Sequence, residues 1–347
     1  MRHGLLALAC AAGLAMTRPA PGADASHSIL RFDDLAGWQD DDHQAALDVF
    51  LNTCSIMKDA EWQALCALAQ SGPDARRFFE LFFRPVLIND GNPARFTGYF
   101  EPELSGSRKR SARFRYPIYR KPAEVREGIP WLTRQQIEES GVLRGRGLEL
   151  AWVEDPVDIF FLQIQGSGRI RLQEGGVLRV GYGGSNGRNY SSVGQELVRQ
   201  GVYSEHQVSA QVIRNWVRRN PARGRDLLWV NQSYVFFREI KGLDPDAGPV
   251  GAMNRPLTAE RSLAIDPRHV PLGAPVWIET EGKKPVRRLM IAQDTGSAIK
   301  GAQRGDIFFG TGSEAGKRAG MVRDGGRMIV LLPIQIAYDL VPEGNPE

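Results

Sequence analysis

The chain has 347 residues, of which 42% are hydrophobic and 24% charged, and its formal net charge is +4 at pH 7. These values are typical of a soluble globular protein long enough for two domains or one large one. The 38 Gly and 21 Pro residues favour short strands and turns over a helical bundle. The mild positive charge suits an anionic partner, but no Lys/Arg block with interleaved aromatic residues predicts binding of nucleic acid.

The N-terminal segment predicts a secretory signal peptide over residues 1–25. An apolar run over residues 5–16 follows Arg2, and the small residues of "ADA" at 23–25 offer a cleavage site. The run is shorter than the roughly 20 residues that cross a bilayer, and no later stretch approaches a membrane span. We therefore expect an exported protein without a transmembrane helix. Cys10 follows Leu-Ala, which leaves lipid anchoring open, although it stands early in the apolar run.

Residues 27–84 are expected to be helical. Apolar residues recur there every three or four positions, as in "AALDVFL", "WQALCALA" and "DARRFFELFF". Cys54 and Cys66 lie in two such segments, separated by a short polar turn. In an oxidising compartment, two cysteines across a helical hairpin favour a structural disulfide, and two buried thiols are the alternative.

Beyond Pro85 the sequence changes to the apolar–polar alternation typical of strands, interrupted by Gly, Pro and Ser. A middle region from about 105 to 237 mixes strands and helices. In chain order we expect strands over 158–173 and 177–184, helices over 191–201 and 204–221, and a strand over 233–240. The block that follows consists almost entirely of short strands and glycine turns.

Three aspartates stand at strand ends in this C-terminal block. Asp266 follows "SLAI", Asp294 follows "LMIAQ", and Asp306 precedes "IFFG". Each can simply cap a turn, and the glycines between Asp294 and Asp306 predict a β-hairpin. A carboxyl beside apolar neighbours is also a candidate for the raised pKa that general-acid catalysis at neutral pH requires. Asp306 stands beside such neighbours and is therefore such a candidate.

Motifs spread along most of the chain follow the order found in one family. "FTGYFEP", "FRYPIYRKP", "FFLQIQGSGRI" and "VGYGGSNGRNYSSVG" precede "AIDPRHVPLG…AQDTGSAIKGAQRGDIF". Over roughly residues 95–335 this order resembles the membrane-bound lytic murein transglycosylase A family, with its three-aspartate module. The resemblance implies a mainly β (α+β) fold. Residues 26–104 plus 238–347 would form a double-psi β-barrel catalytic domain with N-terminal helices, and residues 105–237 an inserted β domain for the substrate groove.

The resemblance also implies an activity, the lytic cleavage of peptidoglycan between N-acetylmuramic acid and N-acetylglucosamine with formation of 1,6-anhydro ends. Since the C6 hydroxyl of the sugar attacks C1, one carboxyl can act first as acid and then as base. By position this carboxyl is Asp306, with Asp294 as its assistant and Asp266 supporting the barrel turn. No metal or organic cofactor is implied. The compartment would be the periplasm, in association with the outer membrane.

Several segments carry side chains that could bind a sugar. If "QIQGSGRI" is one strand, Gln165, Ser167 and Arg169 share a face, with Gly166 between, and can bind N-acetyl, hydroxyl and carboxylate groups. The other expected substrate-binding residues are Tyr99, Tyr182, Tyr190 and Lys300. Aromatic rings packed in a core and a solvated loop lysine are the alternatives.

Other catalytic classes lack their motifs. The sequence has no HExxH, no paired His/Cys ligands, no acidic calcium loop and no G-x-S-x-G. Two alternatives stay open. A hydrolase on the same barrel would need a second carboxylate, such as Asp294 or Glu101, to activate water. A non-catalytic wall-binding module would need the groove but not Asp306.

Overall fold

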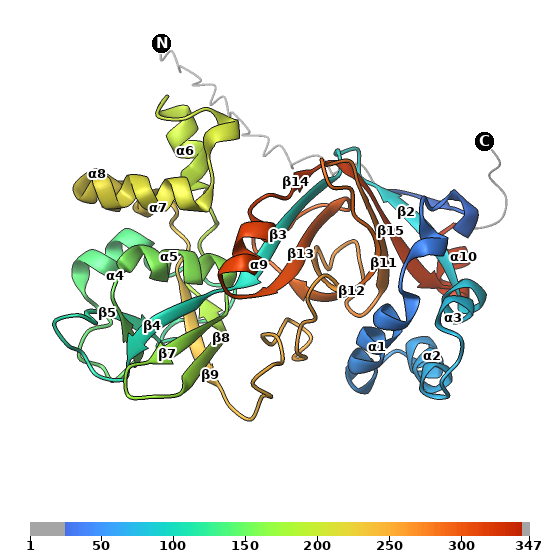
Figure 1. Ribbon diagram of the computed structural model, residues 1–347, viewed down its shortest axis with the longest axis horizontal. Coiled ribbons are helices and arrows are strands. Elements are labelled where there is room, and N and C mark those ends of the chain that lie inside the picture. Colours follow the sequence, from blue (N-terminus) through green and yellow to red (C-terminus); the bar gives the residue numbers. More distant parts are fainter. Residues whose placement is uncertain (1–24, 342–347) are drawn as a thin grey trace, which may run out of the picture.

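The computed structural model describes residues 25–341, which form two β-sheets standing side by side with helices on their flanks (Figure 1). A nine-stranded sheet carries the two ends of the described chain, and a six-stranded sheet carries its middle. The expected mainly β, α+β fold is confirmed. Within the described range, no helix has the length and apolarity needed to cross a membrane. The expected signal peptide and Cys10 lie outside the described residues.

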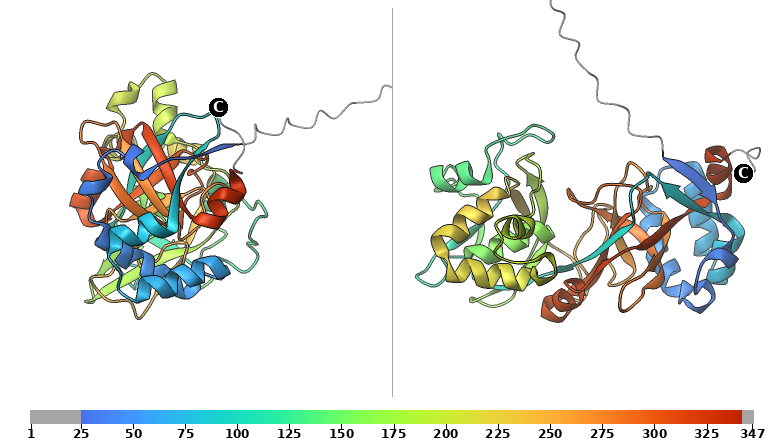
Figure 2. Two further views of the ribbon diagram at one scale, coloured as in Figure 1. Left: turned by 90° about the vertical axis from the view of Figure 1, so that its right-hand side faces the viewer. Right: turned by 90° about the horizontal axis from the view of Figure 1, so that it is seen from above.

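The nine-stranded sheet curls into a barrel-like body (Figures 1 and 2). In order across the sheet, its strands are β1 (Ser26–Ile29), β2 (Phe83–Asn89), β15 (Gly326–Pro333), β11 (Pro275–Thr280), β12 (Arg287–Thr295), β10 (Ser262–Ile265), β13 (Arg304–Thr311), β3 (Arg95–Glu101) and β14 (Arg323–Asp324). The "VWI" run of β11 and the "MIVLL" run of β15 are buried without alternation. Both faces of these strands are therefore covered.

Strand β10 lies between β12 and β13, so these two strands do not form a hairpin. It pairs in parallel with β12 and antiparallel with β13, and β13 pairs in parallel with β3. The hairpin expected between Asp294 and Asp306 is therefore wrong. The connecting segment passes the end of β10, where the Gly301 N–H donates to Asp266. A local strand–turn–strand pattern cannot reveal a third strand that enters from elsewhere in the chain.

Three N-terminal helices pack against the barrel: α1 (His43–Thr53), α2 (Ala60–Gln70) and α3 (Ala75–Phe82). The residue before each is an aspartate whose side chain accepts a backbone N–H of the first turn, namely Asp42, Asp59 and Asp74. A short 3-10 turn, η3 (Cys54–Ile56), follows α1, and a disulfide joins Cys54 to Cys66 in α2. The helical expectation for 27–84 missed β1, a short strand that gains its stability from pairing with β2.

The six-stranded sheet is built from the middle of the chain. In order its strands are β5 (Tyr116–Tyr119), β6 (Glu149–Val153), β4 (Glu103–Ser107), β7 (Gly168–Leu172), β8 (Val177–Ser185) and β9 (Val235–Ile240). The helices attached to it are α4 (Arg134–Ser140), α5 (Pro156–Gln165), α6 (Val193–Arg199), α7 (Ala210–Arg219) and α8 (Pro221–Val230). Helices α5 to α8 share one apolar cluster that includes Phe160, Leu197 and Trp216.

The segment over 158–165, expected to be part of a strand, is the body of helix α5. The Asp155 side chain caps its N-terminus, Pro156 occupies the first turn, and Gly166 ends it in the left-handed conformation at φ +77°. The apolar run "IFFL" has neither strand nor helix periodicity, because α5 is buried between the sheet and the other helices. The capping residues were the signal that could have decided the assignment.

A single residue, Pro102, separates β3 of the larger sheet from β4 of the smaller one. The chain therefore passes from one sheet to the other almost without interruption (Figure 2). It returns through residues 241–261, between β9 and β10. Helix α9 (Gly312–Ala319) follows β13 and packs on β3, where Gly98 meets Ala319 closely.

We predict that Gly98→Ala destabilises the protein. A Cβ at this position would lie 2.7 Å from the Cα and 2.8 Å from the carbonyl oxygen of Ala319. Because these are backbone atoms, β3 and α9 must separate, at a cost of about 1–3 kcal/mol. Thermal unfolding followed by circular dichroism measures the effect. Gly325→Ala is the matched control, since a Cβ there makes only ordinary contacts. Equal melting temperatures for both variants would contradict the prediction.

Candidate active site

Two of the three aspartates lie in one row across the larger sheet. Ala264 of β10 is the register partner of Asp294 in β12 and of Asp306 in β13, and Asp306 is the partner of Thr97 in β3. Side chains of register partners point to the same face of a sheet. Asp294 and Asp306 therefore face the same side, about 10 Å apart at their Cα atoms because one strand separates them. Ala264, between them, is 3% exposed and belongs to a small buried apolar cluster that also includes Tyr99.

Tyr99 and Phe308 lie two residues further along β3 and β13, on the same face. We call the surface formed by Thr97, Tyr99, Ala264, Asp294, Asp306 and Phe308 the aspartate face. The Tyr99 hydroxyl donates a 2.8 Å hydrogen bond to Oδ2 of Asp294, and its ring packs against Phe308 with centroids 5.3 Å apart. Burial and the nearby Asp294 carboxylate raise the pKa of Tyr99 well above its usual value. Tyr99 is therefore a permanent hydrogen-bond donor to Asp294.

Asp306 is half-buried and holds a single side-chain hydrogen bond among the described residues. Thr97 Oγ1 donates to its Oδ1 at 2.5 Å, and Arg304 Nη2 donates to Thr97 Oγ1 at 2.7 Å. Burial raises the pKa of Asp306 to about 6, and the charge of Asp294 adds to the increase, whereas Thr97 and Arg304 oppose it. The carboxyl can therefore hold a proton in mildly acidic solution and release it near neutrality. General acid–base catalysis requires this property.

Asp294, by contrast, is surrounded by donors. In addition to Tyr99, the backbone N–H groups of Ala252 and Thr295 each donate to its Oδ1 at 2.9 Å. Burial raises the pKa of Asp294, and these three hydrogen bonds oppose that increase. Donors on both oxygens favour the ionised carboxylate, which accepts but does not donate. The two aspartates thus differ in chemistry: Asp294 is held as an acceptor, and Asp306 keeps an oxygen available.

Asp266 lies next to β10 but makes a separate set of contacts. It is fully buried, and it accepts from the Arg268 guanidinium at 2.5 Å and from the Gly301 N–H at 2.9 Å. Burial alone would raise the pKa of Asp266, but Arg268 and the backbone donors hold it well below its usual range. The contacts tie the end of β10 to the segment that leads to β13. This arrangement is consistent with the supporting role expected for Asp266.

Buried charges connect the aspartate face to the smaller sheet. Glu101, at the end of β3, accepts from Arg169 Nε at 2.8 Å and from Arg179 Nη2 at 3.3 Å. The same two guanidinium groups donate to backbone carbonyls of the returning segment, at Asp244, Pro245, Ala247 and Gly248. Every charge in this cluster is paired, which is the condition for burying it. Arg169, expected to bind substrate, therefore has its donors engaged within the protein.

The strand that was expected to carry Gln165, Ser167 and Arg169 on one face does not exist in that form. Gln165 is the last residue of α5, Gly166 is its C-cap, and Ser167 is buried just before β7. Gln165 Oε1 accepts a 3.0 Å hydrogen bond from the Phe100 N–H, next to Tyr99 in β3. The alternation is wrong because a helix end and a tight glycine turn replace the first half of the strand.

The remaining expected residues lie at different places. Tyr182 is 54% exposed on β8, and burial raises the pKa of Tyr190, which follows β8 in a loop. Lys300 is exposed and, together with Arg95 and Arg304, lines a cleft of about 370 Å³. Arg95 and Arg304 are register partners two residues before the Thr97–Asp306 pair, so this cleft adjoins the aspartate face.

Sequence reasoning missed four residues that shape the site: Thr97, Ala252, Ala264 and Arg304. The alternation of "RFTGYFE" could have placed Thr97 on the same face as Tyr99. Nothing local marks the others, because their roles depend on strand pairing and on a backbone N–H. Among residues 25–341, no group of three or more His, Cys, Asp or Glu side chains is arranged to hold a metal ion.

Two family models match the parts of the chain that carry this site. Residues 95–238 match the model of the MltA specific insert domain, and residues 261–332 match that of the 3D domain. A membrane-bound lytic murein transglycosylase A of Vibrio cholerae is 34% identical over 263 residues, covering 72% of this chain and 69% of the relative. The chain belongs to the membrane-bound lytic murein transglycosylase A family. The expected resemblance is thus confirmed, and with it the expectation of an enzyme.

Solved structures of similar proteins superimpose on this chain over most of its length. A membrane-bound lytic murein transglycosylase of Agrobacterium tumefaciens superimposes with a TM-score of 0.79 at 34% identity, covering 90% of this chain and 99% of that one. The MltA of Escherichia coli with bound chitohexaose superimposes with a TM-score of 0.70 at 27% identity, covering 88% of this chain and 94% of that one.

We predict that Thr97→Val raises the pKa of Asp306 above its value of about 6. The Thr97 hydroxyl stabilises the ionised carboxylate, so its loss favours the protonated form by about 0.5–1 pH unit. Titration of carboxyl-labelled aspartate by ¹³C NMR measures the change, with Asp306→Asn identifying the signal. Thr258→Val, an exposed threonine in the returning segment, is the control. An unchanged or lower pKa in Thr97→Val would contradict the prediction.

Proposed function

We propose that this enzyme cleaves the β-1,4 bond between N-acetylmuramic acid and N-acetylglucosamine of peptidoglycan and leaves 1,6-anhydro ends, with Asp306 as its single acid/base. The observation that carries the proposal is the difference between the two aspartates on one face. Asp306 has a pKa of about 6 and an available oxygen, whereas three donors occupy Asp294. Family membership supports the reaction class.

In the first half of the reaction, protonated Asp306 donates its proton to the glycosidic oxygen as the bond from that oxygen to C1 of the muramic acid breaks. The carboxylate of Asp306 then removes the proton from the C6 hydroxyl of the same sugar while O6 bonds to C1. No water is consumed, and Asp306 regains its proton. One carboxyl suffices because the substrate supplies the nucleophile, whereas hydrolases need a second group to activate water or attack C1.

Asp294 fits the role of an ionised neighbour better than that of a second catalyst. Its oxygens accept from Tyr99, Ala252 and Thr295, so activation of a water molecule would compete with these bonds. Its charge raises the pKa of Asp306 and so favours the protonated acid. The active form therefore has Asp294 ionised and Asp306 protonated. Protonation of Asp294 sets the acid limb of the pH profile, and deprotonation of Asp306 sets the alkaline limb.

The groove proposed for the glycan crosses the aspartate face between the two sheets. Tyr99 borders the reacting bond, and Tyr182 and Tyr190 offer rings to sugars on the side of the smaller sheet. Ser167 and Gly166 lie at the end of α5, where Gln165 contacts the β3 backbone. We assign Arg169 to positioning, through Glu101, although it was expected to contact substrate. The division into a barrel catalytic domain and an inserted groove domain, and action in the periplasm, belong to the same proposal.

Asp306→Asn should abolish cleavage of purified peptidoglycan, with a loss of about 100-fold or more because no other group supplies the proton. Mass spectrometry of the products of the unmodified enzyme should show anhydro ends. Asp339→Asn, an exposed aspartate of helix α10 (Ile334–Leu340), is the matched control and should retain activity. Reducing ends in the products would favour the water-using hydrolase, and full activity of Asp306→Asn would contradict the role of Asp306.

Lys300 and Arg95 offer positive charge in the cleft beside the aspartate face. Peptidoglycan carries carboxylates on its peptide substituents, so Lys300→Gln combined with Arg95→Gln should raise KM for peptide-bearing glycan. We expect an increase of about fivefold, as for partly exposed ion pairs, with kcat little changed. Lys284→Gln, exposed between β11 and β12, is the control. An equal loss of affinity for chitohexaose, an oligomer without carboxylates, would contradict a charge-specific role.

A further inference from the structure

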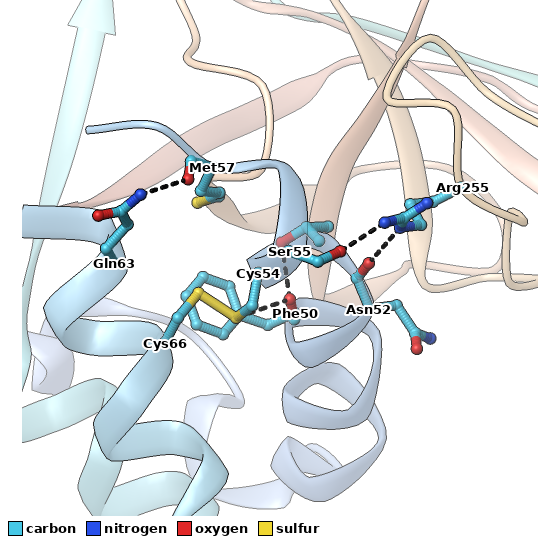
Figure 3. Close-up of a disulfide and its surroundings, with 9 residues drawn as sticks. Phe50, Asn52, Cys54, Ser55, Met57, Gln63, Cys66 and Arg255 are labelled. Carbon is cyan, nitrogen blue, oxygen red and sulfur yellow. Dashed lines mark hydrogen bonds between the residues drawn. A yellow bond between two sulfur atoms is a disulfide. The ribbon is translucent and has the colours of Figure 1, made fainter. Parts of the chain in front are cut away.

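The disulfide-linked hairpin of α1 and α2 reaches the active site through one arginine. Figure 3 shows Cys54 and Cys66 joined by their sulfur atoms, with Arg255 extending from the returning segment to the end of α1. Arg255 Nε donates a 3.1 Å hydrogen bond to the carbonyl oxygen of Asn52, and its Nη2 donates to the hydroxyl of Ser55. Carbonyl groups in the last turn of a helix lack partners within that helix, so an arginine there satisfies them.

Arg255 closes a tight turn whose backbone contacts Asp294. Within residues 251–255, the Gly251 N–H donates to the Arg255 carbonyl at 3.0 Å, and Asn254 has a left-handed φ of +52°. Asparagine is one of the few residues other than glycine that adopts this conformation readily, so it suits a tight turn. The Ala252 N–H of this turn donates to Oδ1 of Asp294, and the Met253 N–H donates to the adjacent Gln293 carbonyl at 3.2 Å.

An apolar contact joins the same two parts of the chain. A Cβ on Gly273 would lie 1.9 Å from the Met57 methyl carbon and 3.1 Å from the Met253 methyl carbon, so both methionines pack directly on this glycine. Met57 follows η3, and Met253 belongs to the turn. Gln63 of α2 donates to the Met57 carbonyl at 3.1 Å, as Figure 3 shows. The helical hairpin and the turn at residues 251–255 are therefore joined at two points, the hydrogen bonds of Arg255 and the packing of both methionines on Gly273.

We infer that Arg255 is a positioning residue for catalysis, which transmits the position of the disulfide-linked hairpin to the carboxylate of Asp294 through the turn at residues 251–255. The inference rests on the proposed role of Asp294. The titratable groups that face Asp294 are Tyr99 from β3 and Asp306 from β13, and Arg304 flanks Asp306. From the turn, only the Ala252 N–H contacts it. Displacement of the turn removes this donor, so protonation of Asp294 becomes easier.

Arg255→Ala in the oxidised full chain tests the inference. The acid limb of the pH profile for peptidoglycan cleavage should move upward by about 0.5–1 pH unit, because one hydrogen bond to the Asp294 carboxylate is lost. The alkaline limb, set by Asp306, should stay in place. At the pH optimum we expect kcat to fall several-fold with KM within about twofold. Arg255→Lys, which can still reach Asn52 or Ser55, should restore part of the shift.

Two comparisons distinguish a positioning role of Arg255 from a general loss of structure. Arg77→Ala removes an exposed arginine of the neighbouring helix α3 and should leave both limbs unchanged. Replacing both Cys54 and Cys66 by alanine should move the acid limb in the same direction as Arg255→Ala, and combining all three changes should add little. Where the cysteine variant does not fold, Ser55→Ala weakens the same contact without breaking the disulfide.

The results distinguish failure of the inference from failure of the proposed function. If Asp294→Asn retains the normal pH profile, the proposed role of Asp294 is wrong. If Asp294→Asn alters the profile but Arg255→Ala does not, the inference is overturned. The inference is also overturned if Arg255→Ala lowers activity equally at every pH in step with its melting temperature, or if its shift and that of the cysteine variant are simply additive.

Discussion

The active site depends on the position of one short strand. Strand β10 has four residues, and its pairing between β12 and β13 sets Asp294 and Asp306 on either side of Ala264. Had β12 and β13 formed a hairpin, they would have been adjacent strands, one strand spacing apart rather than two. Two close carboxylates strongly perturb each other and share a proton. The inserted strand keeps them about two strand spacings apart, so each aspartate acquires its own environment and its own protonation behaviour.

The sequence predicted the fold class and the family, through motifs that follow the order of that family along most of the chain. The roles of the aspartates stay predictions, although the "GDIFF" segment did place the Asp306 carboxyl beside buried residues. The errors also have physical causes. The hairpin failed because strand order is set by contacts between distant segments. Helix α5 was mistaken for a strand because a buried helix has no amphipathic period, although its Asp155 cap was visible in the sequence.

The site residues also fall into two groups: those that a local motif could indicate, and those whose contacts form only when the chain folds. Asp306 and Tyr99 were recognisable from motifs, but the partners that determine their chemistry were not. The donor from Ala252 is a backbone group, which no side-chain pattern reveals. Arg169 was expected to bind a ligand because its charge looked available. Its actual partners, Glu101 and two carbonyls, lie 68 or more positions away in the chain and become neighbours only after folding.

The passage from β3 to β4 through Pro102 has a consequence for how the two sheets are linked. Proline fixes its own φ, and the adjoining strands are hydrogen-bonded into two different sheets, so the first connection between the sheets is a single residue long. The buried Glu101–arginine cluster clamps the second crossing beside it. Both connections between the sheets therefore meet at one buried ion cluster. Loss of either arginine would leave the Glu101 carboxylate partly unpaired at the first connection and would free backbone carbonyl groups at the second, so a single substitution would loosen both.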